Sequence, residues 1–292
     1  MVELITPQSQ KHEIDFLQTD LDATLGNRII SEKSADAIFC FLVDDPNRDV
    51  AIVSARPPAS TKRAVKHAGL ERFLGTQIHI TGFNGSIVYY GERILHDQSI
   101  PSEAAETILE KSRQQDLTGT FFTPDETYFL QDNHWTRTYS GLTGYPMITK
   151  FPHRRQNYYM IELIKDPEED LEAFKQRVGM DVFEKKGEIR SACYPKSIYD
   201  ELQDPPINFI QINTANVDKA DAAQAYMKLL KISPERVLII GDELNDKKSL
   251  ELEGVVSVAM GNAPEEVKQV ARYVTRTVEQ EGVAYTLEHL VR

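Results

Sequence analysis

The stretch DLDATL, Asp20 to Leu25, decides the fold of this chain, because it places two carboxylates directly after the apolar segment Ile14–Thr19. If that segment is a strand, Asp20 and Asp22 both project from its carboxyl end. Open α/β sheets bind ligands outside the carboxyl ends of their strands. The stretch therefore predicts a polar site at the mouth of a parallel sheet, although the same acids could simply end a strand and cap the next helix.

Length and composition set outer limits on the function. The chain has 292 residues, of which 41% are hydrophobic, enough for a large core and for two domains. A net charge of −12 argues against nucleic acid as a partner, because no long Lys/Arg stripe offers counterion release. The longest apolar run, residues 37–43, is too short to span a bilayer. We therefore expect a cytoplasmic protein without a membrane partner, either a monomer or a homodimer.

Strand and helix patterns alternate in the first 82 residues of the chain and again after residue 216. Before residue 82, the expected strands are Ile14–Thr19, Val50–Val53 and Ile78–Ile80, with a helix at Ser60–Ala68. The segment Ala35–Val43 fits a helix capped by Ser34 or, equally, a buried strand. After residue 216, helix patterns flank the apolar strands Val237–Ile240 and Val255–Met260.

Residues 83–215 differ from this pattern, being richer in aromatic residues and in alternating strands. We predict an α/β fold whose Rossmann-like parallel-sheet core comprises residues 1–82 and 216–292. Residues 83–215 are predicted to form an inserted α+β domain.

The acids after the first strand suit phosphoryl chemistry. A carboxylate can attack phosphorus and form an aspartyl-phosphate, which divides one difficult displacement into two easier ones. We assign this role to Asp20. A second carboxylate can protonate the leaving oxygen and then deprotonate the water that hydrolyses the intermediate. Asp22 fits that task.

The segment Gly241–Asp246, with the sequence GDELND, repeats this design after another apolar strand. If the two strands are neighbours, Asp20 and Asp242 can converge on one hard cation such as Mg²⁺. Asp246 would then bind the metal through a water molecule or contact the metal ligands without touching the metal, and it could also serve as a helix N-cap.

Phosphate also needs hydrogen-bond donors. Ser54 follows a strand, so its hydroxyl and the next backbone N–H, that of Ala55, can bind phosphate oxygens. Lys219 opens the helix that follows the inserted region, where its ammonium could hold the transferring group. Taken alone, Ser54 could merely end a strand and Lys219 could be a surface residue.

With these residues in place, the chain resembles the haloacid dehalogenase superfamily of phosphatases, in particular its Cof-like branch. The resemblance covers nearly the whole chain and includes four motifs in order: Asp20–Thr24, Ser54–Arg56, Lys219-Ala220 and Gly241–Asp246. Three further segments also look like that branch: Asn84-Gly85, Gly261–Ala263 and Glu281–Ala284.

The resemblance implies a Mg²⁺-dependent phosphomonoester hydrolase for small phosphorylated metabolites, with sugar phosphates as the expected class. It implies that Asp20, Asp242 and Asp246 hold the metal with the backbone carbonyl of Asp22, and that Asn245 joins Ser54, Ala55 and Lys219 in binding phosphate. A phosphotransferase or phosphomutase stays open, as does a phosphate-binding or regulatory module that has lost turnover.

Three alanines replace the glycines common at these motifs: Ala23, Ala55 and Ala220. The extra methyl costs stability where the backbone needs a left-handed conformation, and it narrows the pocket slightly. We expect Ala55 to matter most, because its N–H should face phosphate. In the inserted domain, a cap by this resemblance, the residues that could contact a phosphorylated sugar are His134, Trp135, Arg137 and the run His153–Arg155.

Overall fold

The computed structural model describes residues 2–27, 29–152, 155–166, 168–195 and 208–292. The chain divides into two compact units, one formed by residues 1–97 and 218–292 and the other by residues 98–217.

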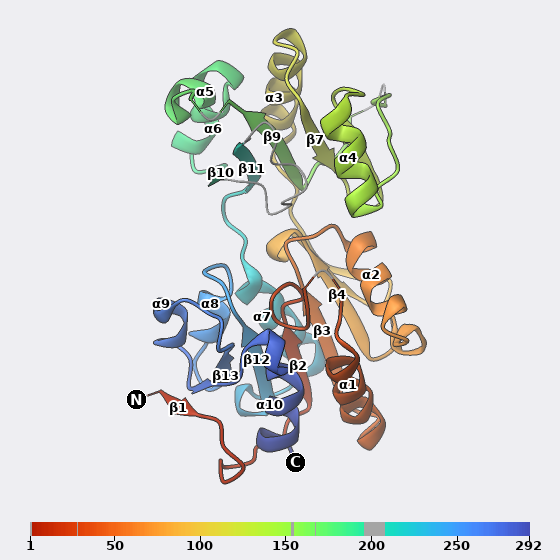
Figure 1. The fold of residues 1–292 in the computed structure, drawn as a ribbon, viewed down its shortest axis with the longest axis vertical. Coiled ribbons are helices and arrows are strands. Elements are labelled where there is room, and N and C mark those ends of the chain that lie inside the picture. The colour runs from red at the N-terminus through yellow and green to blue at the C-terminus, as the bar shows by residue number, and fades with distance from the viewer. Residues whose placement is uncertain (1, 28, 153–154, 167, 196–207) are drawn as a thin grey trace. The chain divides into compact units, whose positions relative to one another are not determined.

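A nine-stranded sheet organises the first unit, in the order β1-β14-β13-β12-β2-β3-β4-β5-β6. Figure 1 labels its central strands β13, β12, β2, β3 and β4. The strands are parallel from β1 to β4, whereas β5 and β6 run antiparallel. Their bounds are β1 Glu3–Leu4, β2 Phe16–Thr19, β3 Asp49–Val53, β4 Ile78–Gly82, β5 Ile87–Tyr90, β6 Arg93–Asp97, β12 Val237–Gly241, β13 Val256–Ala259 and β14 Tyr273–Val274. This sheet confirms the predicted α/β class with its parallel core.

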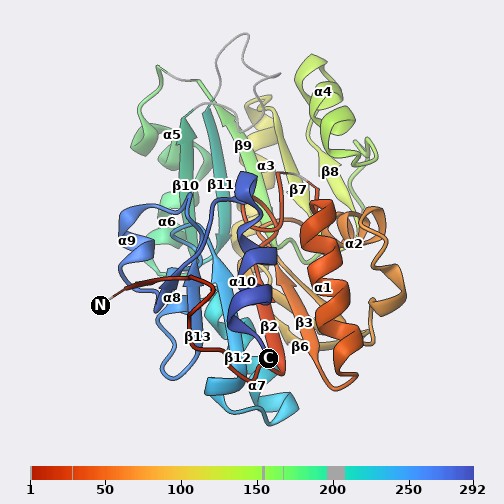
Figure 2. The same ribbon diagram turned by 60° about the horizontal axis from the view of Figure 1, so that its bottom comes forward.

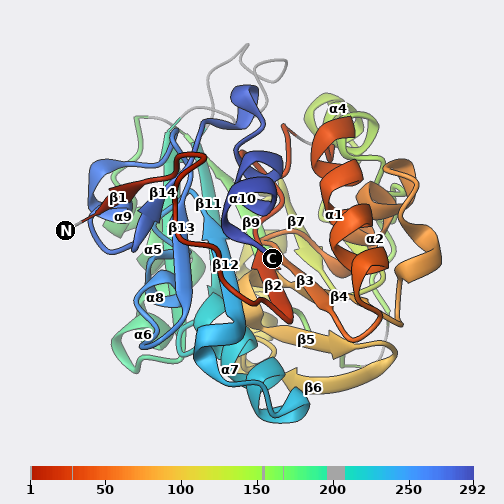
Figure 3. The ribbon, with the colours of Figure 1, turned by 90° about the horizontal axis from the view of Figure 1, so that it is seen from below.

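Successive side chains of a strand point to opposite sides of the sheet. Apolar side chains therefore lie on both faces of this sheet, and helices cover both. On one face, Leu17 and Leu238 pack with helices α1 (Glu32–Asp44), α2 (Pro58–His67) and α10 (Gly282–Leu290). On the other, Phe16 and Ile239 pack with α7 (Lys219–Leu230), α8 (Lys247–Leu250) and α9 (Glu265–Lys268). Helices α1 and α10 lie side by side (Figure 2; Figure 3).

The ambiguous segment Ala35–Val43 is a helix, and it begins earlier than predicted. Its N-cap is Ser31, whose hydroxyl accepts a hydrogen bond from the backbone N–H of Ser34 at 3.2 Å. Ser34 is therefore not the cap but the third residue of α1.

The first unit extends beyond the predicted boundary at residue 82. Thr81 pairs with Val88 across β4 and β5, so that the hairpin of β5 and β6 continues the sheet of the first unit. The compact units separate at residues 97 and 98, and again at 217 and 218, close to the predicted return at 216.

The second unit is a five-stranded antiparallel sheet in the order β10-β11-β9-β7-β8. Helices α3, α5 and α6 supply apolar side chains such as Ile108, Phe174 and Phe183 to one face of it. The bounds are α3 Ser102–Gln114, β7 Gly119–Phe122, β8 Thr127–Phe129, α4 His134–Thr143, β9 Met160–Lys165, α5 Leu171–Val178, α6 Met180–Lys185, β10 Ile189–Pro195 and β11 Asn208–Thr214. Among the described residues, no helix is both long enough and apolar enough to cross a membrane.

Candidate active site

Two motifs far apart in sequence meet at the carboxyl ends of β2 and β12. These strands are parallel neighbours, with Thr19 opposite Ile240, and the N–H of Asp20 donates to the carbonyl of Ile240 at 3.2 Å. In the sheet, β3 lies on one side of β2 and β12 on the other, so the strand order reverses direction at β2. Open α/β sheets bind ligands at such a switch point.

Lys219 joins these two motifs through its ammonium. Its Nζ lies 2.9 Å from Oδ2 of Asp20 and 2.8 Å from Oδ1 of Asp246. All three side chains are buried, and that of Lys219 is only 1% exposed. Lys219 is therefore part of the carboxylate cluster and not a solvated surface residue.

Asp246 owes its position to Gly241. Oδ2 of Asp246 accepts hydrogen bonds from the backbone N–H groups of Asp242 and Glu243, each at 3.1 Å. A Cβ added at Gly241 would lie 2.5 Å from Cβ and Cγ of Asp246, far inside van der Waals contact. A glycine is required here because the strand end and the Asp246 carboxylate approach so closely.

Asp242 is fixed by two side chains that lie in the segments singled out in the sequence but were assigned no role there. Thr24 Oγ1 donates to Oδ1 of Asp242 at 2.6 Å, and Asn262 lies near its other oxygen at 3.5 Å. Asn262 also donates to the carbonyl of Ala23 at 3.0 Å. These contacts tie the loop after β2 to the loop after β12.

The three aspartates Asp20, Asp242 and Asp246 can each offer a carboxylate oxygen, and these oxygens lie within 4.8 Å of one another. Hard oxygen donors of this kind fit Mg²⁺. Asp22 is outside this group of carboxylates; its predicted contribution is a backbone carbonyl, and that stays a prediction.

Burial and mutual repulsion shift the protonation of this cluster. Burial raises the pKa of Asp20 well above its ordinary value, outweighing the attraction of Lys219. Burial likewise raises the pKa of Asp242, to about 7. Burial lowers the pKa of Lys219, but the charges of Asp20 and Asp246 more than offset this, so its pKa lies above the ordinary value. The site therefore holds a protonated lysine among carboxylates that a further cation would stabilise.

Asp22 lies apart from the cluster, held by Arg56. Arg56 Nε donates to Oδ2 of Asp22 at 2.7 Å, and its Nη2 contacts Oδ1, which makes a two-point ion pair. The Asp22 side chain is 45% exposed, unlike the three buried aspartates. Arg56 belongs to the second motif, but no sequence pattern assigned it this role.

The predicted phosphate donors come from the loops after β3 and β12. Ser54 is buried, and its Oγ accepts from the backbone N–H of Arg56 at 3.1 Å. Asn245 Nδ2 donates to Oδ1 of Asn84 at 3.0 Å. The other end of the Asn245 amide, Oδ1, is buried without a hydrogen-bond partner among the described residues.

Of the three alanines that replace glycine, only Ala23 has the left-handed backbone that favours glycine. Its φ is +53°, whereas Ala55 and Ala220 do not occur among the described non-glycine residues with positive φ. Ala220 lies inside helix α7. The added methyl is therefore a strain at Ala23 alone.

In the second unit, none of the predicted contact residues forms a comparable cluster among the described residues. Arg137 pairs with Asp132 at 2.6 Å, and Arg155 pairs with Glu106. Trp135 stacks on Tyr139 with 5.0 Å between ring centroids. His134 is exposed, and His153 and Arg154 lie outside the described residues.

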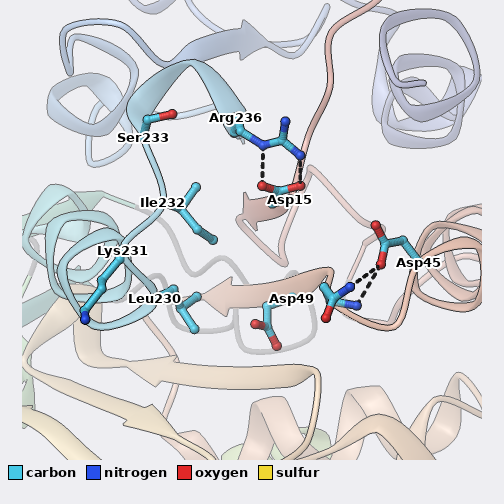
Figure 4. Close-up of a pocket in the computed structure, with 9 residues that line it drawn as sticks. Asp15, Asp45, Asp49, Leu230, Lys231, Ile232, Ser233 and Arg236 are labelled. Atoms are coloured by element: carbon cyan, nitrogen blue, oxygen red, sulfur yellow. Dashed lines mark hydrogen bonds and ion pairs between the residues drawn. The ribbon is translucent and has the colours of Figure 1, made fainter.

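A separate pocket of about 520 Å³ lies at the amino ends of the core strands, the opposite edge from the aspartates (Figure 4). Its acids are already engaged: Asp15 faces Arg236, Asp45 accepts from Asn47, and Asp49 pairs with His79 at 3.0 Å. The pocket offers no comparable group of free carboxylates among the residues described.

The fold and this cluster define an α/β protein with a buried carboxylate site at the carboxyl ends of its parallel strands, and comparison with known proteins identifies its family. Residues 17–287 match the model of the haloacid dehalogenase-like hydrolases. The chain therefore belongs to that family, which confirms what the four motifs predicted.

Its relatives extend over most of the chain. Phosphatase YwpJ of Bacillus subtilis is 27% identical and covers 75% of this chain and 81% of its own length. The 5-amino-6-(5-phospho-D-ribitylamino)uracil phosphatase YitU of the same organism is 26% identical, with 94% and 96% covered. The solved structure of TM0651 from Thermotoga maritima is 25% identical, covers 96% of this chain and 98% of its own, and superposes with a TM-score of 0.76.

Proposed function

We propose that this protein is a Mg²⁺-dependent phosphomonoester hydrolase that acts on small phosphorylated metabolites. One observation supports this most: acids more than two hundred residues apart, Asp20 and Asp242, converge with Asp246 around the Lys219 ammonium. That arrangement supplies a nucleophile, a cation site and a fixed positive charge in one buried place.

In the proposed reaction, a carboxylate oxygen of Asp20 attacks phosphorus while the bond from phosphorus to the leaving oxygen breaks. Asp22 gives its proton to the leaving oxygen and then takes one from the attacking water. That water breaks the aspartyl-phosphate bond, releasing inorganic phosphate and restoring both carboxyl groups. Both carboxylate oxygens of Asp22 are engaged by Arg56, so the pair has to open before Asp22 can face the leaving oxygen or the water.

The remaining residues bind and balance charge. Lys219 offsets the charge of Asp20, and the Ser54 hydroxyl, the Ala55 N–H and the Asn245 amide are proposed to hold the phosphate oxygens. Asp20, Asp242 and Asp246, with the Asp22 carbonyl, would hold Mg²⁺, which when bound offsets negative charge on the phosphate.

For the substrate we propose phosphate esters of sugars or sugar alcohols. The support is that two relatives covering at least 94% of this chain, YitU and YcsE, are named as phosphatases of a phosphoribityl compound. A cytoplasmic location and a monomeric or dimeric state stay predictions from the sequence.

The test is phosphate release from a panel of phosphorylated metabolites, including hexose phosphates, pentose phosphates and 5-amino-6-(5-phospho-D-ribitylamino)uracil, with Mg²⁺ and with EDTA. We expect release that requires Mg²⁺. Absence of release from every compound, with no transfer to an added alcohol, would favour the module without turnover. Formation of a new phosphate ester on an added acceptor alcohol, in place of inorganic phosphate, would favour a phosphotransferase.

A further inference from the structure

We propose that Asn84 is a positioning residue for phosphate binding, which holds the Asn245 amide and the Ser54 loop in one fixed arrangement. This inference rests on the proposed function, because it assumes that Ser54, Ala55 and Asn245 bind phosphate. Asn84 follows β4 and comes from neither motif that supplies these donors.

The first support is the hydrogen bonding on either side of Ala55. The N–H of Asn84 donates to the carbonyl of Ser54 at 3.0 Å, and the N–H of Phe83 donates to the carbonyl of Arg56 at 3.2 Å. The Ser54 carbonyl and the Ala55 N–H belong to the same peptide group, so the bond from Asn84 fixes the plane in which the Ala55 N–H lies. The bond from Phe83 holds the next part of the loop, at the Arg56–Pro57 peptide.

The second support is the side chain of Asn84. It is buried, with 7% of the residue exposed, and its Oδ1 accepts from Nδ2 of Asn245 at 3.0 Å. The other end of the Asn245 amide has no partner among the described residues and is buried. Asn84 therefore fixes the amide at one end and leaves its other end for a ligand.

The amide pair also explains how that free end can become a donor. Turning both amides over about their Cβ–Cγ bonds makes Asn84 the donor and Asn245 the acceptor, with little change in shape. The NH₂ of Asn245 then occupies the position without a partner. A phosphate oxygen, which only accepts, would select this arrangement.

The third support is the backbone of the segment. Phe83 and Asn84 are consecutive residues with positive φ, +53° and +57°. Such conformations are uncommon for residues other than glycine and cluster at functional sites, and asparagine tolerates them better than most residues. Both residues are buried, so the surrounding structure determines this turn.

The test separates the side chain from the turn. Asn84→Gly keeps a backbone that accepts positive φ but removes the amide, and it is combined with Asn245→Ala as single and double variants. Inhibition by inorganic phosphate and the KM and kcat for p-nitrophenyl phosphate are measured with Mg²⁺. The matched control is Lys231→Gly, since Lys231 also has positive φ (+56°) but is exposed at the end of α7.

We expect Asn84→Gly to weaken inhibition by phosphate about two- to twelve-fold, the value of one hydrogen bond, with a similar rise in KM and little change in kcat. The double variant should match Asn245→Ala alone, and Lys231→Gly should match the wild type in phosphate inhibition. Effects of Asn84→Gly that are absent, or that add in full to those of Asn245→Ala, would overturn the inference while leaving the proposed function in place. A wild-type protein that neither releases nor binds phosphate would refute both.

Discussion

Replacing Lys219 by methionine tests the charge balance of the carboxylate cluster. Methionine keeps an unbranched side chain of similar length but removes the ammonium that lies 2.9 Å from Asp20 and 2.8 Å from Asp246. Both carboxylates are buried, so they would face each other without a counter-charge. Removing one partner of a buried ion pair costs about 3–5 kcal/mol of the free energy of unfolding.

The assay is urea unfolding at pH 8 in EDTA, with Lys248→Met as the matched control. Lys248 also forms an ion pair, with Asp218 at 2.7 Å, but its side chain is 70% exposed. Exposed pairs contribute about 0–1 kcal/mol, so the control should be close to the wild type.

The loss caused by Lys219→Met should shrink at pH 5. Burial already raises the pKa of Asp20, and without the lysine its carboxyl binds a proton more readily still. Protonation removes the uncompensated charge. Equal free energies of unfolding for Lys219→Met and Lys248→Met at pH 8 would show that the Lys219 ammonium does not balance the charge of the carboxylates.

Three further predictions concern the same loops. Ala23→Gly should raise the free energy of unfolding by about 0.5–1 kcal/mol, because relief of the strain at a φ of +53° exceeds the added entropy of the unfolded chain. Ala220→Gly, inside a helix, should lower the free energy of unfolding. Equal effects of the two substitutions would contradict this explanation. Asp20→Asn should abolish phosphate release. Asp22→Asn should slow phosphate release by a factor of about 10²–10⁴, the usual contribution of general acid–base catalysis. Wild-type rates for Asp20→Asn would exclude Asp20 as the nucleophile. In EDTA, the folded state binds a proton at Asp242 more tightly than the unfolded state does, so stability should fall as pH rises from about 4 to about 7, and Mg²⁺ should reverse this above pH 7. Thermal unfolding with and without Mg²⁺ at pH 5 and pH 8 checks this last prediction, which a metal effect of equal size at both values would contradict.

Much of the core could be predicted because its signals are local. An apolar segment bounded by acids or glycine, such as Val237–Ile240 before Gly241, predicts a buried strand wherever it lies in the chain. The strands β2, β3, β4, β12 and β13 all overlap their predicted segments. The error at the start of α1 has a local cause too, because Ser31 and Ser34 are both acceptable caps and only the backbone decides between them.

The boundary after residue 82 could not be placed in this way. The sequence of β5 and β6 is compatible with strands in either unit. The pairing of β5 with β4 assigns this hairpin to the first unit. Pairing partners are chosen by the whole sheet, which no window of sequence contains.

For the site, the sequence by itself determined which residue types stand at the strand ends, namely the acids of the first and fourth motifs and the serine, and that a lysine opens helix α7. Only the tertiary structure decided what each of them faces. It brings Arg56 to Asp22, Thr24 to Asp242 and Asn84 to Asn245, contacts that span 34, 218 and 161 residues of chain. The physical reason is that propensity and hydrophobic pattern act over a few neighbouring residues, whereas hydrogen bonds between side chains form wherever packing brings donor and acceptor together.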